Sequence, residues 1–328
     1  MGFALGIDIG GTFTKLVAMG EDRRVLGESR LPTEAAAGPA ALVDRAAAAC
    51  RQLCTASGLD ASSARAVGVG IAGLVNSTTG VLVAAPNLAG WERFAVADAF
   101  AAAFGCPAAV ENDANAFALG EATLGAGRGC DPVALITLGT GVGGGLVAGG
   151  RIVHGRHGYA GEFGHMALTV DQGPRCACGA RGCVEAYLRS SHVVALALEL
   201  SANAADSPSP TLARALAAGE ATARTVGEAA REGDPVALAV FRQLGRYLGV
   251  AIANIISAFN PQVVIAGGGV ALAGEVLLTV ARSTALARVL PPLAADVSIL
   301  PAALGDQGGV LGAGLLALAH EPKSPGAG

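Results

Sequence analysis

A short stretch near the middle of the chain concentrates imidazole, thiol and carboxylate side chains that can bind a metal ion or accept hydrogen bonds. They are Glu162, His165, Cys176, Cys178, Cys183 and Glu185. Three thiolates and one imidazole make a closed tetrahedral ligand set, which is typical of structural zinc because no position is left for water. We therefore predict a structural zinc ion bound by His165, Cys176, Cys178 and Cys183. Reduced cysteines in a mobile loop are the alternative.

A glycine-rich turn, LGTGVGGG at 138–145, follows the apolar run 133–138, which has the composition of a buried strand. Glycines let the backbone reach positive φ and come close to a ligand, so that amide groups can point at phosphate oxygens. The turn is predicted to bind phosphate through Gly139, Thr140, Gly141, Gly143 and Gly144. A hairpin that only reverses the chain is the alternative.

The N-terminus repeats this arrangement, with an apolar strand at 3–9, the turn Gly10-Gly11-Thr12 and a second strand at 13–19. Two such hairpins predict two similar half-domains facing one nucleotide. Asp8, at the end of the first strand, is placed to hold a hydrated magnesium ion that bridges phosphates. The P-loop pattern is absent, and no G-x-G-x-x-G opens a helix after a strand, so neither of those nucleotide folds is indicated.

Asp113 is the predicted catalytic residue. It follows Asn112 at the start of an expected helix, 114–124. Phosphoryl transfer to a hydroxyl needs a carboxylate that accepts the alcohol's proton, together with electrostatic positioning of the phosphates. Asn112 could hydrogen-bond a polyol acceptor. A structural role for Asp113 as the helix cap is the alternative.

Alternating strands and helices predict an α/β protein of two lobes. Strands are expected at 3–9, 13–19, 24–31, 66–72, 108–111, 133–138, 263–266 and 297–300. Helices are expected at 38–57, 95–104, 114–124, 190–202, 211–218, 234–259 and 308–319, with one more after Gly269. Cys50 and Cys54 lie one helical turn apart, which is more typical of a buried face than of a reactive pair.

Composition narrows the possible partners. The 328 residues are enough for two domains with sizeable cores. The net charge of -4 gives no electrostatic footprint for nucleic acid. Because we find no secretion signal and no membrane-length apolar run free of charges and glycines, we expect a cytoplasmic protein without a membrane partner.

Five segments together resemble the ROK family of sugar kinases and related repressors: DIGGT, ENDAN at 111–115, LGTGVGGG, AGEFGH at 160–165 and CACGARGCVE at 176–185. This family belongs to the superfamily of sugar kinases, heat-shock proteins and actin-like ATPases. The resemblance implies a two-lobed, actin-like or hexokinase-type (RNase H-like) fold, with ATP and sugar in the interdomain cleft. It also implies a homodimer formed through the larger lobe.

The resemblance assigns roles to single residues. Asp113 matches the catalytic base, and the four predicted zinc ligands match a structural zinc site. The substrate-binding set is Gly73, Asn87, Asn112, Asp113, Glu162, His165 and Glu185. The phosphate loops are Gly10 to Thr12 and Gly139 to Gly144, and Gly267, Gly268 and Gly269 match the adenosine side. Many relatives have lysine directly after GGT, whereas here Phe13 follows and Lys15 comes two positions later, so the role of Lys15 is left open.

The expected activity is ATP-dependent phosphorylation of a hexose at its 6-hydroxyl. Glucose is favoured over N-acetylmannosamine, N-acetylglucosamine and fructose, because PNLAGW at 86–91 resembles the glucokinases of this family. Two other classes are a sugar-responsive transcriptional repressor and a catalytically silent sugar-binding regulator. The repressors carry a helix-turn-helix domain before the first strand, and here only two residues precede Phe3.

Two lobes are expected from the positions of the loops. The small lobe should comprise 1–115 and 309–328, with the first phosphate loop and Asp113 at its boundary. The large lobe should comprise 116–308, with the second phosphate loop, the zinc site, the adenosine side and the dimer contacts.

Overall fold

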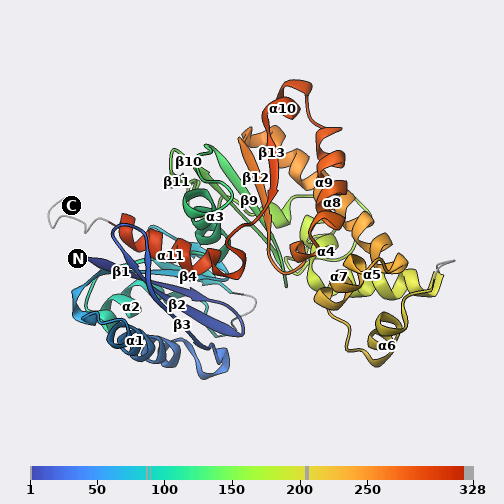
Figure 1. Ribbon diagram of the computed structural model, residues 1–328. Coiled ribbons are helices and arrows are strands. Elements are labelled where there is room, and N and C mark those ends of the chain that lie inside the picture. Colours follow the sequence, from blue (N-terminus) through green and yellow to red (C-terminus); the bar gives the residue numbers. More distant parts are fainter. Residues whose placement is uncertain (1, 86–87, 89, 204–206, 321–328) are drawn as a thin grey trace. The chain divides into compact units, whose positions relative to one another are not determined.

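The computed structural model describes residues 2–85, 88, 90–203 and 207–320. The chain divides into two compact units (Figure 1). The first comprises 1–125, 145–161 and 306–328, and the second comprises 126–144 and 162–305. Strands and helices alternate through most of the chain, so the predicted α/β class is confirmed.

The first unit is built on a five-stranded sheet. Its order is β3 (Val25–Pro32), β2 (Phe13–Gly20), β1 (Phe3–Ile9), β4 (Ala64–Ile71) and β8 (Ala108–Asn112). β1, β2 and β3 form an antiparallel meander, whereas β1, β4 and β8 are parallel. Six of the seven residues of β1 are buried, as expected for a central strand covered on both faces.

Helices cover both faces of this sheet (Figure 1). α1 (Pro39–Ala56) packs on β2 and β3, and α2 (Val96–Phe104) packs on β4 and β8. α11 (Gly308–Ala319) packs on β1 and β4 and also contacts α3 (Asp113–Leu124). A second, three-stranded sheet consists of β5 (Leu74–Asn76), β6 (Val81–Ala84) and β7 (Phe94–Ala95).

A second five-stranded sheet repeats the topology of the first. Its order is β11 (Arg151–Ile152), β10 (Val142–Ala148), β9 (Val133–Leu138), β12 (Val263–Gly267) and β13 (Ser298–Pro301). Counted from its own first strand, each sheet has the order 3-2-1-4-5. The two sheets therefore share one topology, and each opens with a strand–turn–strand hairpin, as the sequence predicts. β11 and the end of β10 belong to the first unit, and the other strands of this sheet belong to the second.

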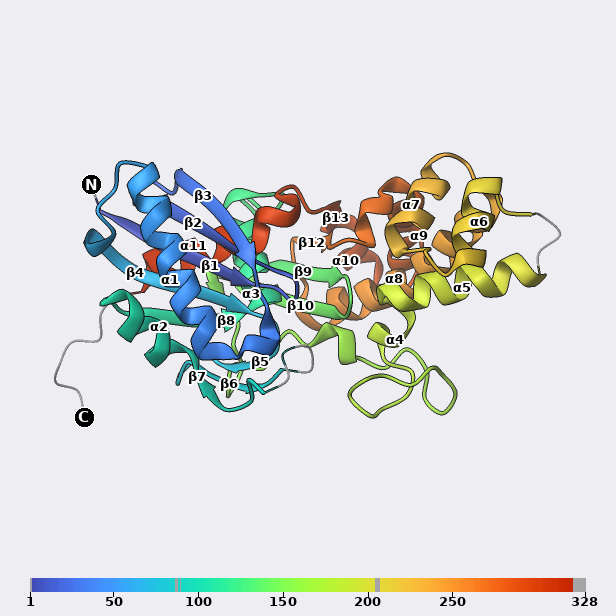
Figure 2. The same ribbon diagram turned by 90° about the horizontal axis from the view of Figure 1, so that it is seen from below.

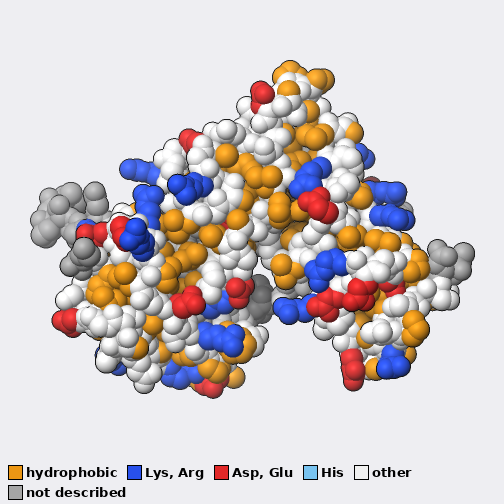
Figure 3. Space-filling view, viewed as in Figure 1, with side chains coloured by type: hydrophobic (Ala, Val, Ile, Leu, Met, Phe, Trp, Pro, Cys, Tyr) orange, Lys and Arg blue, Asp and Glu red, His pale blue; other side chains and the backbone are white. Residues whose placement is uncertain are grey.

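The second unit contains a group of helices, in which α5 (Ser190–Asn203), α7 (Ala223–Arg231), α8 (Pro235–Phe259) and α9 (Glu275–Leu286) lie together (Figure 2). The other helices are α4 (Val184–Leu188), α6 (Pro210–Ala218) and α10 (Pro291–Asp296). By length and composition α8 could cross a membrane, but 61% of its apolar window is buried in the fold. Acidic and basic side chains are interspersed on the face that Figure 3 shows.

Besides residues 306–308, the first unit includes two longer segments, 116–125 and 145–161, that were expected in the larger lobe. The first belongs to α3, which packs on α11. The second begins at Gly145, where a Cβ would lie 2.7 Å from the Ala118 side chain of α3. Both segments therefore belong to the first unit through α3: the first is part of this helix, and the second packs against it.

Candidate functional site

The first unit brings two carboxylate-bearing residues together at one edge of its sheet. β1, β4 and β8 are parallel, so their carboxyl ends meet there, and the register aligns Asp8 with Gly70 and Gly70 with Glu111. A Cβ at Gly70 would lie 3.6 Å from Asp8 Oδ1 and 3.9 Å from Asp113 Cα. The predicted magnesium-binding residue and the predicted base are therefore close neighbours.

Asp113 is the first residue of α3, and the N-cap is Asn112. The Asn112 Oδ1 accepts hydrogen bonds from the backbone N–H groups of Ala114 at 2.9 Å and Asn115 at 3.2 Å. The structure thus gives the capping role to Asn112 and not to Asp113. Burial raises the pKa of the Asp113 carboxyl, and a hydrogen bond from the Ala114 N–H partly offsets this. A raised pKa suits a general base that works near neutral pH.

Asn112 also reaches a second residue of the predicted substrate-binding set. Its Nδ2 donates to the Gly73 carbonyl oxygen at 2.9 Å. The cap occupies the Asn112 amide oxygen, and the bond to Gly73 uses one of its two Nδ2 hydrogens. Asn87, the remaining member of the set in this part of the chain, lies outside the described residues.

Lys15 lies opposite Asp8 in the β1–β2 pair. Its Nζ is 3.0 Å from Asp306 Oδ2, and it also donates to the Asp306 carbonyl oxygen just before α11. Burial and the nearby Asp113 raise the pKa of Asp8 to about 7, and Lys15 opposes that rise. Lys15 therefore links β2 to the start of α11 and offsets part of the negative charge, a role that the sequence left open.

Thr33, which was not predicted from the sequence, forms hydrogen bonds to the first glycine loop. Thr33 Oγ1 donates to the Gly10 carbonyl oxygen at 2.7 Å, and its N–H donates to the Thr12 carbonyl at 2.9 Å. Thr14 Oγ1 lies 3.0 Å from Thr33 Oγ1, and both threonines are fully buried. Gly11 and Thr12 are exposed, so the tip of the loop is open to a ligand.

The second glycine loop has the same kind of support, provided by Ser190 at the start of α5. The Ser190 Oγ and N–H both donate to the Gly139 carbonyl oxygen, each at 2.7 Å. Thr140 at the tip is exposed. In each unit, a hydroxyl from a residue distant in sequence thus binds the carbonyl of the first loop glycine.

The expectation that the loop glycines adopt positive φ is wrong. Positive φ is found at none of Gly10, Gly11, Gly139, Gly141, Gly143 and Gly144. Gly143 and Gly144 lie within β10, and the turn itself is Gly139–Gly141. Close approach applies at Gly141, where a Cβ would lie 2.7 Å from Glu185 Oε2, whereas a Cβ at Gly11 would meet no atom within 4 Å.

The third glycine turn does require positive φ. Gly268, directly after β12, has φ of 87°, and a Cβ there would lie 2.4 Å from the Leu138 carbonyl oxygen. Gly267 is the last residue of β12 and pairs with Thr137 of β9, whereas Gly269 is exposed.

Gly269 lines a hollow of about 190 Å³ in the second unit. Arg224, Glu228 and Arg231 of α7 form its charged wall, and Leu272 contributes apolar surface. Arg231 Nη1 donates to the Leu272 carbonyl oxygen. Gly269 was predicted from the sequence for the adenosine side, whereas α7, which includes the lining residue Gly227, was not predicted.

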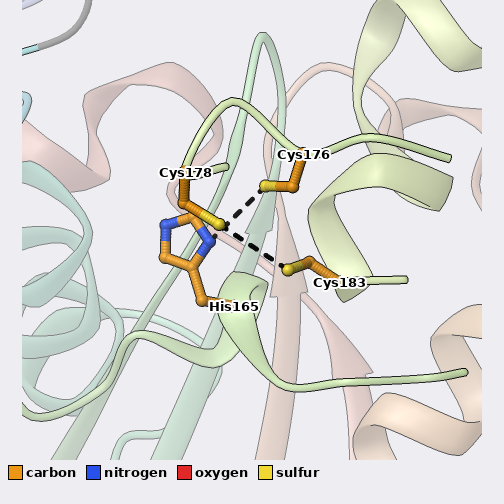
Figure 4. A group of neighbouring side chains, drawn as sticks. All are labelled: His165, Cys176, Cys178 and Cys183. Atoms are coloured by element: carbon orange, nitrogen blue, oxygen red, sulfur yellow. Dashed lines mark hydrogen bonds between the residues drawn. The ribbon is translucent and has the colours of Figure 1, made fainter. Parts of the chain in front are cut away.

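The four predicted zinc ligands lie together (Figure 4), with their ligand atoms within 4.8 Å of one another. Cys178 Sγ is 3.8 Å from Cys183 Sγ, and Cys176 Sγ is 3.7 Å from His165 Nδ1. Sulfur ligands about 2.3 Å from a tetrahedral ion are about 3.8 Å apart. The donor set and its spacing therefore fit zinc.

Local structure assembles this metal cluster, by which we mean His165, Cys176, Cys178 and Cys183. His165 ends the short 3-10 helix Phe163–His165, and Cys183 is the N-cap of α4. The Cys176 N–H donates to the Ala180 carbonyl oxygen at 2.9 Å and closes the loop between the cysteines. Burial raises the pKa of the Cys183 thiol, so metal binding must displace its proton.

The predicted sugar-binding carboxylates of the second unit adjoin the metal cluster. His165 Nε2 lies 3.9 Å from Glu162 Oε2, while its Nδ1 faces Cys176. Glu185 Oε1 accepts from Cys176 Sγ at 3.3 Å, and Glu185 Oε2 accepts from the Val142 N–H at 3.1 Å. Glu185 therefore connects the metal cluster to the second glycine loop.

Comparison with known proteins identifies the family. The family model described as ROK family matches residues 4–320. A glucokinase of Halalkalibacterium halodurans is 36% identical over 318 residues, which cover 97% of this chain and 95% of the relative. An N-acetylmannosamine kinase of Shigella boydii is 34% identical over 313 residues, covering 95% and 97%.

A solved structure agrees with these matches. The crystal structure of a ROK family glucokinase from Streptomyces griseus, in complex with glucose and AMPPNP, has a TM-score of 0.81 and is 35% identical. The match covers 96% of this chain and 99% of that one. From the matched family model and these full-length similarities, we conclude that the chain belongs to the ROK family.

Proposed function

We propose that this protein is an ATP-dependent hexokinase that converts glucose to glucose 6-phosphate. The observation that carries the proposal is the placement of Asp113, a carboxylate with a raised pKa at the start of α3, beside Asp8. Full-length similarity to glucokinases supports glucose as the acceptor. The N-acetylmannosamine kinase among the relatives makes acetamido sugars the competing substrates.

In this proposal Asp113 accepts the proton of the glucose 6-hydroxyl. The sugar oxygen forms a bond to the γ-phosphorus as the bond to the bridging oxygen breaks, and ADP leaves with that electron pair. Glu162, His165 and Glu185 hydrogen-bond the sugar hydroxyls, with His165 oriented by the metal cluster. Burial of Asp113 favours proton uptake from the alcohol, because it disfavours the charged carboxylate.

The nucleotide side is assigned to the glycine turns. Loops Gly10–Thr12 and Gly139–Gly141 would contact the phosphates, and the hollow lined by Gly269, Arg224 and Arg231 would hold the adenosine. Magnesium, for which Asp8 is the proposed protein contact, neutralises phosphate charge when it is bound with ATP. We also propose a zinc-containing, cytoplasmic homodimer.

The function is tested by a coupled ADP-release assay with glucose, mannose, fructose, N-acetylglucosamine and N-acetylmannosamine. We expect glucose to give the highest kcat/KM. A higher value with either acetamido sugar would reassign the substrate. ADP release with none of the sugars would reject the kinase and favour a sugar-responsive regulator.

Ser190→Ala is expected to raise KM for ATP about threefold to tenfold and to leave KM for glucose unchanged. The reason is that the Gly139 carbonyl oxygen loses the hydroxyl donor that holds it in place, and one hydrogen bond contributes about 0.5–1.5 kcal/mol. Steady-state kinetics with each substrate varied in turn measures the effect.

Ser201→Ala is the matched control for this experiment. It removes a hydroxyl–carbonyl hydrogen bond of the same length, 2.7 Å, from the same helix, without contact to the loop. If both serine variants show the same KM for ATP, the hydroxyl support of the second loop has no role in nucleotide binding.

A further inference from the structure

Glu111 is a fully buried carboxylate that neither the sequence analysis nor the proposed reaction uses. It lies on β8, two residues before Asp113, and its side chain is only 1% exposed. A buried carboxylate is costly unless its oxygens accept hydrogen bonds from well-placed donors. Glu111 therefore needs hydrogen-bond donors, and the positions of these donors indicate its role.

Two of the partners belong to the first turn of α3. Glu111 Oε1 accepts from the Asn112 N–H at 2.9 Å and from Asn115 Nδ2 at 3.0 Å. These residues lie on either side of Asp113 in sequence. One carboxylate thus holds the start of the helix at two points, while the Asn112 cap and its bond to Gly73 hold it at others.

The third partner is His154, which comes from the segment after β11. Its Nε2 lies 2.5 Å from Glu111 Oε2, and 40% of the His154 side chain is exposed. The hydrogen bond and charge of Glu111 raise the pKa of His154 and so favour the imidazolium that donates to the carboxylate. His154 is therefore the accessible end of a chain of contacts that leads inward to the turn bearing Asp113.

We propose that Glu111 and His154 act as a positioning pair, which holds the first turn of α3 so that the Asp113 carboxylate is aligned with the acceptor hydroxyl. This inference rests on the proposed role of Asp113 as the base. Neither residue of the pair needs to touch the substrate. The bond from His154 fixes the Glu111 carboxylate, and Glu111 fixes the Asn112 peptide and the Asn115 side chain.

His154→Leu and His154→Gln separate positioning from simple structural support. Leucine removes the donor, whereas the glutamine amide can place an N–H close to the position of Nε2. We expect His154→Leu to lower kcat about tenfold to a hundredfold, with KM for glucose and for ATP changed less than about twofold. His154→Gln should restore kcat to within about threefold of the wild type.

His157→Leu is the matched control, because His157 is an exposed histidine of the same segment. It should behave as the wild type. The positioning pair is rejected if His154→Leu keeps wild-type kcat, or if the leucine and glutamine variants lose kcat equally and in step with melting temperature.

The exchange rate of backbone amides, measured by mass spectrometry on peptides covering 111–116, tests the proposal without an assay of activity. The Asn112 amide should exchange about tenfold faster in His154→Leu than in His154→Gln, because its acceptor is no longer fixed. Equal exchange in the two variants contradicts the proposal.

Asp113→Asn, assayed in parallel, separates failure of this inference from failure of the proposed function. An Asp113→Asn variant with wild-type kcat removes the base assignment. An inactive Asp113→Asn beside a fully active His154→Leu rejects the positioning pair alone.

Discussion

Asp113→Asn is expected to lower kcat about 10²- to 10⁴-fold and to leave the dissociation constant for glucose within about threefold of the wild type. The amide keeps the shape of the carboxyl and removes the group that takes the proton. The helix should persist, because Asn112 and not Asp113 is the cap of α3. Single-turnover ADP formation and isothermal titration calorimetry with glucose measure the two quantities.

Asp44→Asn provides the control for Asp113→Asn, since Asp44 is an exposed carboxylate of α1 in the same unit. It should retain wild-type kcat. Wild-type turnover by Asp113→Asn would remove Asp113 from the chemistry, whereas loss of glucose binding would give it a binding role instead.

Loss of the metal cluster is expected to weaken stability and sugar binding together. Cys183→Ser removes a thiolate ligand beside the first residue of α4, and Glu185 lies in the first turn of that helix. A loss of about 3–5 kcal/mol corresponds to a fall in Tm of about 10 °C for a domain of this size. The dissociation constant for glucose should rise at least about tenfold, because His165 would lose the proposed zinc ion that orients its ring.

Cys130→Ser is the control, because Cys130 is a half-buried cysteine of the second unit outside the cluster. Elemental analysis should find one zinc per chain in the wild type and in Cys130→Ser, and much less in Cys183→Ser. The zinc assignment fails if the wild type holds none, or if Cys183→Ser matches Cys130→Ser in metal content, Tm and glucose affinity.

Local sequence signals were sufficient for the long elements and the metal cluster. The apolar runs predicted β1, β2, β9 and β12 to within one residue, because buried strands leave continuous hydrophobic segments. The sequence also predicts that the four residues of the metal cluster lie together, because three cysteines are close along the chain. The three strands of the small sheet were missed, since they have only two to four residues each, and α7 was missed as well.

Contacts between residues distant in sequence could not be predicted from local sequence patterns. Lys15 and Asp306, 291 positions apart, meet only because α11 packs on the first sheet. Ser190 meets Gly139 across 51 positions, and Glu111 meets His154 across 43. Such pairs are set by tertiary packing, and neither residue type nor local spacing marks them in advance.

The loop glycines show that one residue type can meet different backbone requirements. The sequence predicted positive φ at the hairpin tips, but Gly10, Gly11, Gly139 and Gly141 do not adopt it. At Gly141 the restriction is the approach of Glu185, a residue 44 positions later. A single sequence cannot distinguish these two requirements, because both select glycine.

A crystal structure of the Asp113→Asn variant with glucose and a non-hydrolysable ATP analogue tests the central claim most directly. The account predicts that the residue 113 side chain lies within about 3.2 Å of the glucose 6-hydroxyl oxygen. It also predicts that this oxygen is in line with the γ-phosphate. A sugar bound with its 6-hydroxyl turned away from residue 113, toward another carboxylate or toward solvent, would contradict it.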